Sequence, residues 1–278
     1  MKLAVLVPYR EPSAELDLAL RGLLAQSGSG WDLELVLVHN GESKCDVAPA
    51  TEMPFPVHHR CIGHQKPAYS LASARNAGLQ STQATWVLCL DADCVPAPGH
   101  FASLARQLGK VADANLIIAG ERRFVDVRAE DQGVELYHQL AKLPAVPSRS
   151  NHGRSIDVRF PYLRNPAESP HPWDLMHGGN VAFRRDVAVA IGGFDEEFDG
   201  HWGFEDAEFA YRMIQRGAAT PAFAREAIVY HQESGEDIAS QDRGSRHTNP
   251  NWHRACDLIP GFEEFKSMRR REIYGHDS

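Results

Sequence analysis

The first 120 residues alternate between short apolar runs and segments whose apolar positions recur every three or four residues. The first apolar run covers residues 3–9 and the second covers residues 33–41, so each is predicted to be a buried strand. Between them, Ser13 is a suitable N-cap, and a helical repeat of leucine and alanine runs from Leu16 until Gly28 interrupts it. Strand, helix and strand in this order predict a right-handed βαβ unit.

The same alternation continues beyond this unit. Residues 68–82 predict a second helix, and residues 85–94 contain a third buried strand whose apolar run stops at two aspartates. A helix at 100–110 and a strand at 115–120 follow. This order predicts an α/β fold, with a Rossmann-like, mostly parallel twisted sheet and helices on both faces.

The pattern weakens from residue 121 to residue 176, where six prolines are scattered among His and Arg residues. An irregular connection of this length inside a compact domain is usually functional. Residues 177–240 return to strands and helices, and residues 241–278 have the composition of a polar tail. The sequence is therefore divided into segments 1–120, 121–176, 177–240 and 241–278.

Composition narrows the choice of partners. The chain has 278 residues and a formal net charge of −8, which argues against nucleic acid as the main partner because phosphates recruit Lys and Arg. No apolar run approaches the roughly 18 residues of a membrane span, and the start is too quickly polar for a signal peptide. Five cysteines without a Cys-x-x-Cys pair predict reduced thiols in a cytoplasmic protein. They are Cys45, Cys61, Cys89, Cys94 and Cys256.

Asp91 and Asp93 directly follow the third predicted strand. Ligands of open α/β sheets collect at the carboxyl ends of strands, and two carboxylates on alternate positions can converge on Mg²⁺ or Mn²⁺. His231 ends the last predicted strand and can complete such a site. The alternative is structural, since Asp favours turns such as the one before Pro96 and a single His is commonly a hydrogen-bonded core residue.

Two further features can contact a ligand. Arg75 lies on the second predicted helix, and its fork can bind two oxygens of a phosphate or carboxylate, although a helical Arg is usually just solvated. Gly178, Gly179 and Asn180 precede a predicted strand. Glycines there allow close approach of the backbone to a ligand, or they form a turn.

The stretch HWGFEDAEFAYRMIQRG begins with three carboxylates and two aromatic residues and continues as an ordinary amphipathic helix. Glu205, Asp206 and Glu208 in a first turn are favoured by the helix dipole by roughly 0.3–1 kcal/mol each. The dipole accounts for the charge but not for Trp202 and Phe204 on the Gly-containing loop. Trp is a natural platform for the apolar face of a sugar ring. The alternative to a helix start that is only stabilised by its charges is therefore a reaction site.

Seven short blocks, in their order, resemble GT-A fold glycosyltransferases of the family 2 type. The blocks are VLVPYRE, ARNAGLQ, VLCLDADC, HGGNVAFRR, IGGFDEEF, WGFEDAEFAYRMIQRG and VYH. The later blocks also resemble the acceptor half shared with galactosyl- and N-acetylgalactosaminyltransferases. The resemblance implies the GT-A fold with a smaller mixed acceptor-side sheet. It assigns segment 1–120 to the nucleotide sugar and segment 177–240 to the acceptor and catalysis, and it does not cover segment 121–176 or the last forty-odd residues.

The resemblance also implies a metal site and a nucleotide site. The run from Asp91 through Ala92 to Asp93 corresponds to the DXD motif, with Asp93 a direct ligand of Mn²⁺ or Mg²⁺ and Asp91 beside the ribose or the metal. His231 corresponds to the third metal ligand. The positions implied to line the nucleotide are Pro8, Tyr9, Arg10, Glu11, Asn40, Arg75, Asp91 and Ala92.

The implied reaction moves a sugar from a nucleotide-diphosphate sugar to a hydroxyl of a glycan, lipid-linked or small-molecule acceptor. Asp206 is then the catalytic base and Glu205 orients the acceptor, with Trp202, Gly179 and Asn180 beside it. One base without a second nucleophilic carboxylate favours inversion. Retention is the alternative, because the group that shares the acceptor half has retaining members.

The nucleotide base is less certain from the resemblance, since this chain departs from the family pattern at one turn. The second strand of the family usually ends in an acidic VDDGS-like turn that holds uracil, whereas this chain has His39, Asn40 and Gly41 there. An amide both donates and accepts, while a carboxylate only accepts from the uracil N–H. A UDP-sugar is the first expectation, and GDP or another nucleotide is the alternative.

Two other functions compete with transfer. A non-catalytic nucleotide-sugar or glycan-binding domain would not need both the DXD motif and the Glu-Asp pair. A nucleotidyltransferase would need a Gly-rich basic loop after the first strand, which VPYREPSAE lacks. The basic run at 266–271 predicts a solvated helix face or a weak contact with anionic lipid. Residues of segment 121–176 that are expected at an acceptor pocket or lid are His138, His152, Arg154, Arg159 and His171.

Overall fold

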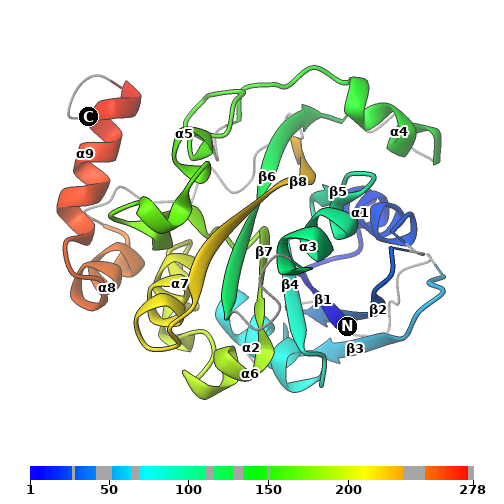
Figure 1. The fold of residues 1–278 in the computed structure, drawn as a ribbon, viewed down its shortest axis with the longest axis horizontal. Coiled ribbons are helices and arrows are strands. Elements are labelled where there is room, and N and C mark those ends of the chain that lie inside the picture. The colour runs from blue at the N-terminus through cyan, green and yellow to red at the C-terminus, as the bar shows by residue number, and fades with distance from the viewer. Residues whose placement is uncertain are drawn as a thin grey trace.

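The computed structural model describes residues 1–26, 29–41, 52–63, 69–109, 115–127, 134–148, 151–233 and 248–274. Eight strands of this part of the chain form one curled sheet in the order β3-β2-β1-β4-β7-β6-β8-β5 (Figure 1). The strands are β1 (Lys2–Tyr9), β2 (Asp32–His39), β3 (Val57–Cys61), β4 (Trp86–Leu90), β5 (Cys94–Pro96), β6 (Leu116–Asp126), β7 (Asn180–Arg184) and β8 (Thr220–Glu233).

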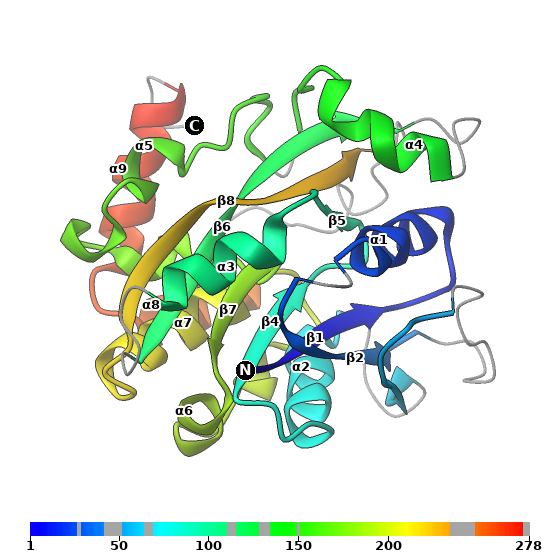
Figure 2. The same ribbon diagram turned by 45° about the vertical axis from the view of Figure 1, so that its right-hand side comes forward.

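Helices cover both faces of the sheet (Figure 2). Apolar side chains of α1 and α3 pack on one face, and those of α2 and α7 pack on the other. The helices are α1 (Ala14–Leu24), α2 (Leu71–Gln80), α3 (His100–Gly109), α4 (Val134–Gln139), α5 (Phe160–Leu163), α6 (Arg185–Ala190), α7 (Glu205–Gln215), α8 (Pro250–Leu258) and α9 (Phe262–Tyr274). The predicted α/β class is confirmed.

The first half of the sheet is parallel, as the apolar runs predict. β1 pairs in parallel with both β2 and β4, so its two faces are buried: Leu3 and Val5 face α1, while Ala4 and Leu6 face α2. This double burial explains why the run has no polar alternation. Ser13 caps α1 as expected, since its hydroxyl accepts from the backbone N–H of Leu16.

The second half of the sheet is mixed. β7 is antiparallel to both β4 and β6, β6 is parallel to β8, and β5 is antiparallel to β8. The expected smaller mixed sheet is thus continuous with the parallel one, because β7 pairs with β4 from Trp86↔Arg184 to Leu90↔Asn180. This pairing brings the residues that precede β7 beside the aspartates that follow β4.

Segment 121–176 is more regular at its start than the sequence suggests. β6 continues through Asp126, and after a register shift at Gly120 it pairs with residues 228–233 of β8. A Cβ on Gly120 would lie 2.3 Å from the carbonyl oxygen of Ala227, so the shift requires a glycine. The prolines that obscured the pattern all come later in the segment.

Residues 248–274 of the expected polar tail are folded onto the domain. They form α8, α9 and the turn between them, and Trp252, Ile259 and Phe262 of this segment are buried in the main hydrophobic core. These few apolar residues stand among many charged ones, so composition did not reveal them. Lys266 pairs with Asp174, and Arg269 is 7% exposed, so the basic run at 266–271 presents only part of its charge to solvent. The division of the chain into four segments stays a prediction.

The expectation of reduced thiols needs a correction. Cys61 at the end of β3 is disulfide-bonded, whereas Cys89, Cys94 and Cys256 are free. Cys45 lies outside the described residues. An unpaired spacing pattern therefore did not exclude a disulfide, and the cytoplasmic location, which rested partly on the thiols, stays a prediction. No helix among the described residues is long and apolar enough to cross a membrane.

Asn180 and His100 join three strands of the mixed half, β6, β7 and β8, to α3. The Asn180 amide nitrogen donates to the carbonyls of Ala227 at 2.9 Å and Glu121 at 3.2 Å. Its oxygen therefore accepts, and the partner is His100 Nε2 at 3.0 Å, which must carry the ring proton. His100 is fully buried, and burial lowers its pKa to about 4.

The neutral state of His100 predicts acid sensitivity. Between the ordinary pKa of 6.5 and the folded value of about 4, the unfolded chain binds a proton that the folded protein excludes. Stability is therefore present above this window and is lost as pH falls through it, by about 3 kcal/mol in total. We expect His100→Gln, which keeps a donor for Asn180, to flatten the decline in unfolding free energy between pH 7 and pH 4.5. An unchanged slope in urea titrations would contradict this role.

Candidate active site

Helix α2 is held in place by the segment that precedes α7. Asp199 accepts from the backbone N–H groups of Ala72 at 3.0 Å and Ser73 at 3.2 Å, which gives α2 the N-terminal partner that its own Ser70 does not supply. Asn76 exchanges hydrogen bonds with the backbone of Phe194, at 2.9 and 2.8 Å. These contacts fix the position of Arg75, which lies between Ser73 and Asn76 on α2.

Arg75 is 1% exposed and bridges the two halves of the molecule. Its Nη1 donates to Glu205 Oε1 at 2.7 Å, and its Nη2 donates to Asp91 Oδ1 at 3.2 Å. Burial alone would lower the pKa of the guanidinium, but the two carboxylates raise it above its ordinary value. In this structure both terminal nitrogens of Arg75 are bound to carboxylates, and its expected contact with the nucleotide stays a prediction.

The glycine pair before β7 lies against this bridge. A Cβ on Gly178 would lie 2.4 Å from Arg75 Nη2, and a Cβ on Gly179 would lie 2.6 Å from Asp91 Oδ2. Gly178 also donates its backbone N–H to Asp206 Oδ2 at 3.0 Å. At both positions the absence of a side chain lets the backbone lie close to Arg75 and Asp91.

Asp206 and Glu205 have different environments although they are adjacent. Glu205 is 6% exposed and faces Arg75; burial and the charge of Asp206 raise its pKa to about 7, against the pull of the arginine. Asp206 is half-buried, and its two oxygens accept from the backbone of Gly178 and of Ala207. Of the two carboxylates, Asp206 is the one that is partly exposed to solvent.

The predicted metal ligands come together in part. Asp93 Oδ2 lies 3.5 Å from His231 Nε2, and Asp93 Oδ1 is buried without a hydrogen-bond donor among the described residues. Burial lowers the pKa of His231, but Asp93 and Glu233 more than offset this effect. The Cys94 sulfur also lies within 4.8 Å of both groups, but burial holds the pKa of its thiol far above the ordinary value and keeps it protonated. Asp91 Oδ1 accepts from Arg75, and its expected place beside the metal or the ribose stays a prediction.

The loops that follow β1, β2 and β3 meet at one edge of the sheet. Asn40 donates its backbone N–H to the carbonyl of Tyr9 at 2.9 Å, and a Cβ on Gly41 would lie 1.8 Å from the carbonyl oxygen of Arg10. Asn40 is 8% exposed, and its side-chain oxygen accepts no hydrogen bond from the described residues. The expected loop positions Pro8, Tyr9, Arg10 and Glu11 run from the buried end of β1 to the exposed turn.

Trp202 and Asn180, both expected beside the acceptor, differ in how far they are exposed. Trp202 is half-buried, with its ring 6.1 Å from that of Phe204. Asn180 is 1% exposed, and both ends of its amide are used within the fold. Asn180 therefore joins elements of the sheet, and its expected place beside the acceptor stays a prediction.

The residues of segment 121–176 are distributed between core and surface. Arg159 is 1% exposed, pairs with Asp157 at 2.7 Å and donates to the carbonyl of Leu175, so it is part of the core. His138, His152 and Arg154 are exposed, and His171 packs on Phe265 with ring centroids 4.1 Å apart.

Sequence reasoning missed two polar residues near the site. Arg122 on β6 donates to His177 Nδ1 at 2.9 Å, directly beside the glycine pair. The available signal was the spacing of Arg122 and Phe124, which are two residues apart in β6 and therefore lie on the same face of the strand. Phe124 pairs with His231 in the parallel β8, so this face lies beside the predicted metal ligand.

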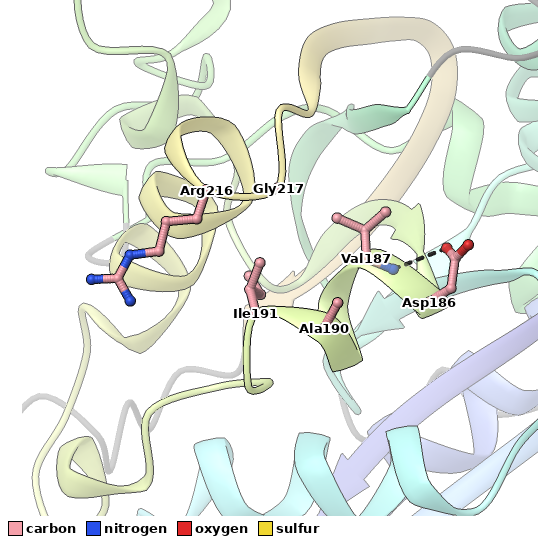
Figure 3. A pocket seen from close by; sticks show the side chains of 6 residues that line it. All are labelled: Asp186, Val187, Ala190, Ile191, Arg216 and Gly217. Atoms are coloured by element: carbon pink, nitrogen blue, oxygen red, sulfur yellow. Dashed lines mark hydrogen bonds between the residues drawn. The ribbon is translucent and has the colours of Figure 1, made fainter.

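A shallow hollow of about 510 Å³ lies elsewhere, between α6 and the end of α7 (Figure 3). Its lining residues are Asp186, Val187, Ala190, Ile191, Arg216 and Gly217. None of the predicted site residues belongs to it.

Comparison with known proteins agrees with this arrangement. The model of glycosyl transferase family 2 matches residues 4–192, which is more than half of the chain. The chain belongs to glycosyl transferase family 2. A second model, described as the N-terminal domain of galactosyltransferase, matches residues 162–232.

Relatives of this family 2 chain include polysaccharide synthases. It is 26% identical over 255 residues to a chondroitin synthase of Escherichia coli and 28% identical over 243 residues to a hyaluronan synthase of Pasteurella multocida. These matches cover 87% and 83% of the chain but only 36% and 24% of the relatives. The chain thus spans about a third or less of the length of these synthases.

Solved structures confirm the GT-A fold of the family 2 chain. GalNAc-T7, crystallised with UDP, GalNAc and Mn²⁺, matches with a TM-score of 0.63 at 17% identity, over 99% of this chain and 51% of that one. A mannosyltransferase from Pyrobaculum calidifontis, in complex with GDP-Man and Mn²⁺, matches with a TM-score of 0.52 at 15% identity, over 99% of this chain and 76% of that one.

The buried bridge predicts a large effect of removing its cation. Arg75→Met removes the counter-charge of the buried Glu205 and of the partly exposed Asp91, so we expect a loss of about 3–5 kcal/mol in unfolding free energy, measured in urea. Arg106→Met is the matched control, because Arg106 pairs with Glu226 on the surface, where the side chains are 58% and 73% exposed. We expect the control to change stability by less than about 1 kcal/mol. Equal losses in both variants would refute the special position of Arg75.

Proposed function

We propose that this chain is a metal-dependent glycosyltransferase that moves a sugar from a UDP-sugar to an acceptor hydroxyl with inversion, with Asp206 as the general base. The observation that carries the proposal is the difference between the two adjacent carboxylates. Glu205 is bound to Arg75, whereas Asp206 is partly exposed and fixed through Gly178. A fixed and accessible carboxylate is what proton abstraction from a hydroxyl requires.

The donor is proposed to bind across the carboxyl ends of β1, β2 and β4. In open α/β sheets this edge is the usual ligand site. The buried oxygen of Asn40 accepts no hydrogen bond within the part of the chain that the structure describes, which suits an N–H of a nucleobase, and its amide nitrogen can also donate. Uracil offers one N–H flanked by carbonyls, so this pair of functions supports UDP. One of the similar solved structures contains UDP and the other contains GDP-mannose, so a test of the nucleobase must compare UDP with GDP.

A divalent metal is proposed to be held by Asp93 and His231. The orphaned Asp93 oxygen and the adjacent imidazole fit a cation such as Mn²⁺, since carboxylate and imidazole are both suitable ligands. Glu233 lies 3.2 Å from His231 Nδ1 and orients the ring for this purpose. When bound, the metal supplies neutralisation of the leaving diphosphate.

Residues of the chain then explain where the acceptor's hydroxyl proton goes and why the anomeric configuration is inverted. The acceptor oxygen bonds to the anomeric carbon as the bond from that carbon to the phosphate oxygen breaks, and the hydroxyl proton passes to Asp206. The nearby Glu205 is occupied by Arg75 at 2.7 Å, so it does not supply a nucleophile for a two-step route. Direct displacement with inversion follows from this arrangement. Trp202 offers a ring face for the acceptor.

The base assignment predicts a separation between binding and catalysis. Asp206→Asn has nearly the same shape and keeps one of the two acceptor oxygens that face Gly178 and Ala207, but it cannot take a proton, so we expect kcat to fall by at least about 10²-fold. Nucleotide affinity, measured by calorimetry with Mn²⁺, is expected to change less than about twofold. Near-normal turnover in this variant would remove Asp206 from the role of base.

A thermal-shift assay tests both the metal requirement and the identity of the nucleobase. UDP is expected to raise the Tm more in Mn²⁺ than in EDTA, and more than GDP does, because binding to the native state alone stabilises it. Asp93→Ala is expected to abolish the Mn²⁺-dependent part and leave the shift in EDTA unchanged. An equal loss in both conditions would make Asp93 structural, and a larger shift with GDP would reassign the donor.

A further inference from the structure

The start of α8 is attached to the loop that precedes α7. Asn251 is 1% exposed, and its amide nitrogen lies within hydrogen-bond distance of three loop carbonyls. These belong to Phe198 at 2.8 Å, His201 at 3.0 Å and Gly203 at 3.0 Å. An amide has two N–H groups, so the three carbonyls share both of them.

A second asparagine of the same turn extends this contact. Asn249 donates its amide N–H to the carbonyl of Trp202 at 3.0 Å. Its side-chain oxygen accepts from the backbone N–H of Asn251 at 3.0 Å and thereby caps α8. One side chain thus supplies the helix cap and a donor to the loop, and the two asparagines together cover four loop carbonyls between residues 198 and 203.

The loop that they hold is strained where it enters α7. Phe204 has φ of 73°, a left-handed conformation that costs a residue with a side chain about 1 kcal/mol or more. Its ring packs edge-on against Trp252 of α8 and Phe262 of α9, with centroids 5.7 and 5.3 Å away. Strain of this kind persists only where the surroundings impose it, and α8 and α9 are those surroundings.

The strained residue directly precedes the two site carboxylates. Glu205 and Asp206 are the first residues of α7, so the direction of the loop at Phe204 sets where both carboxylates lie. Neither family model includes α8, since the matches end at residues 192 and 232.

We infer that Asn249 and Asn251 are positioning residues for the reaction: they hold the loop from residue 198 to residue 203, impose the left-handed turn at Phe204, and so direct the Asp206 carboxylate to the acceptor hydroxyl. This inference rests on the proposed role of Asp206 as base. It makes α8 part of the catalytic unit. These hydrogen bonds go to the loop before α7, so we expect the variants below to act on the position of Asp206 more than on nucleotide binding.

The sharpest test uses Asn249→Asp. Aspartate keeps the capping oxygen for α8 but replaces the donor to the Trp202 carbonyl with a repelling oxygen. Asn249→Ser also keeps a cap and removes the donor without adding charge. We expect kcat to fall about tenfold or more in both, because a displacement of about 1 Å at a reacting group can cost 10²-fold. The Kd for UDP with Mn²⁺ is expected to stay within about twofold.

Asn251→Asp extends the test to three carbonyls and is expected to lower kcat further, if circular dichroism shows that it folds. The matched control is Asn115→Asp. Asn115 donates its amide N–H to the carbonyl of Gly217 at the opposite end of α7, so its loss perturbs the same helix away from the site. We expect the control to retain kcat.

The outcomes separate this inference from the proposed function. A selective fall of kcat in the Asn249 variants, with intact nucleotide binding and an active control, supports it. Variants of Asn249 that lose no more kcat than Asn115→Asp overturn it, as does a parallel loss of kcat and UDP affinity, which would indicate general damage. Transfer that survives Asp206→Asn overturns the base assignment and this inference with it. Transfer that is lost in Asp206→Asn but kept in Asn249→Asp overturns this inference alone.

Discussion

The ion pairs of one buried arginine connect the parts of this molecule that must act together. Arg75 lies between Asp91, which follows a strand of the parallel half, and Glu205, which begins α7. A buried guanidinium needs carboxylate partners, and a buried carboxylate needs a cation, so the three groups stabilise one another only in this arrangement. The glycines before β7 leave space for it, and Asp199 holds the helix that carries it.

The sequence predicts the parallel half of the fold well, because strands buried on both faces appear as continuous apolar runs. β1, α1 and β4 lie where those runs and the Ser13 cap place them. The mixed half is less predictable. β6 extends through a polar stretch after Gly120, and its pairing with β8 depends on a register shift that no local pattern reveals. Helix α8 contributes Trp252 to the core from a segment of mostly polar composition.

Within the site, residue type predicted which side chains matter better than it predicted what they contact. Asp93 and His231 lie together as the motif suggests, whereas Arg75 and Asn180 have partners inside the protein. A single sequence shows that a polar residue is present but not whether its partner is a ligand or another part of the chain. The same limit applies to Glu205 and Asp206, since only burial distinguishes them.

The antiparallel pairing of β4 with β7 limits where residues can be inserted into the chain. Leu90 lies opposite Asn180, so Asp91 and Gly179 are the next residue beyond the pair on each strand. Side chains alternate along a strand, and a shift of one residue on either side would turn the wrong group toward the bridge. The few residues around this crossing therefore cannot take an insertion without moving Gly179 away from Asp91.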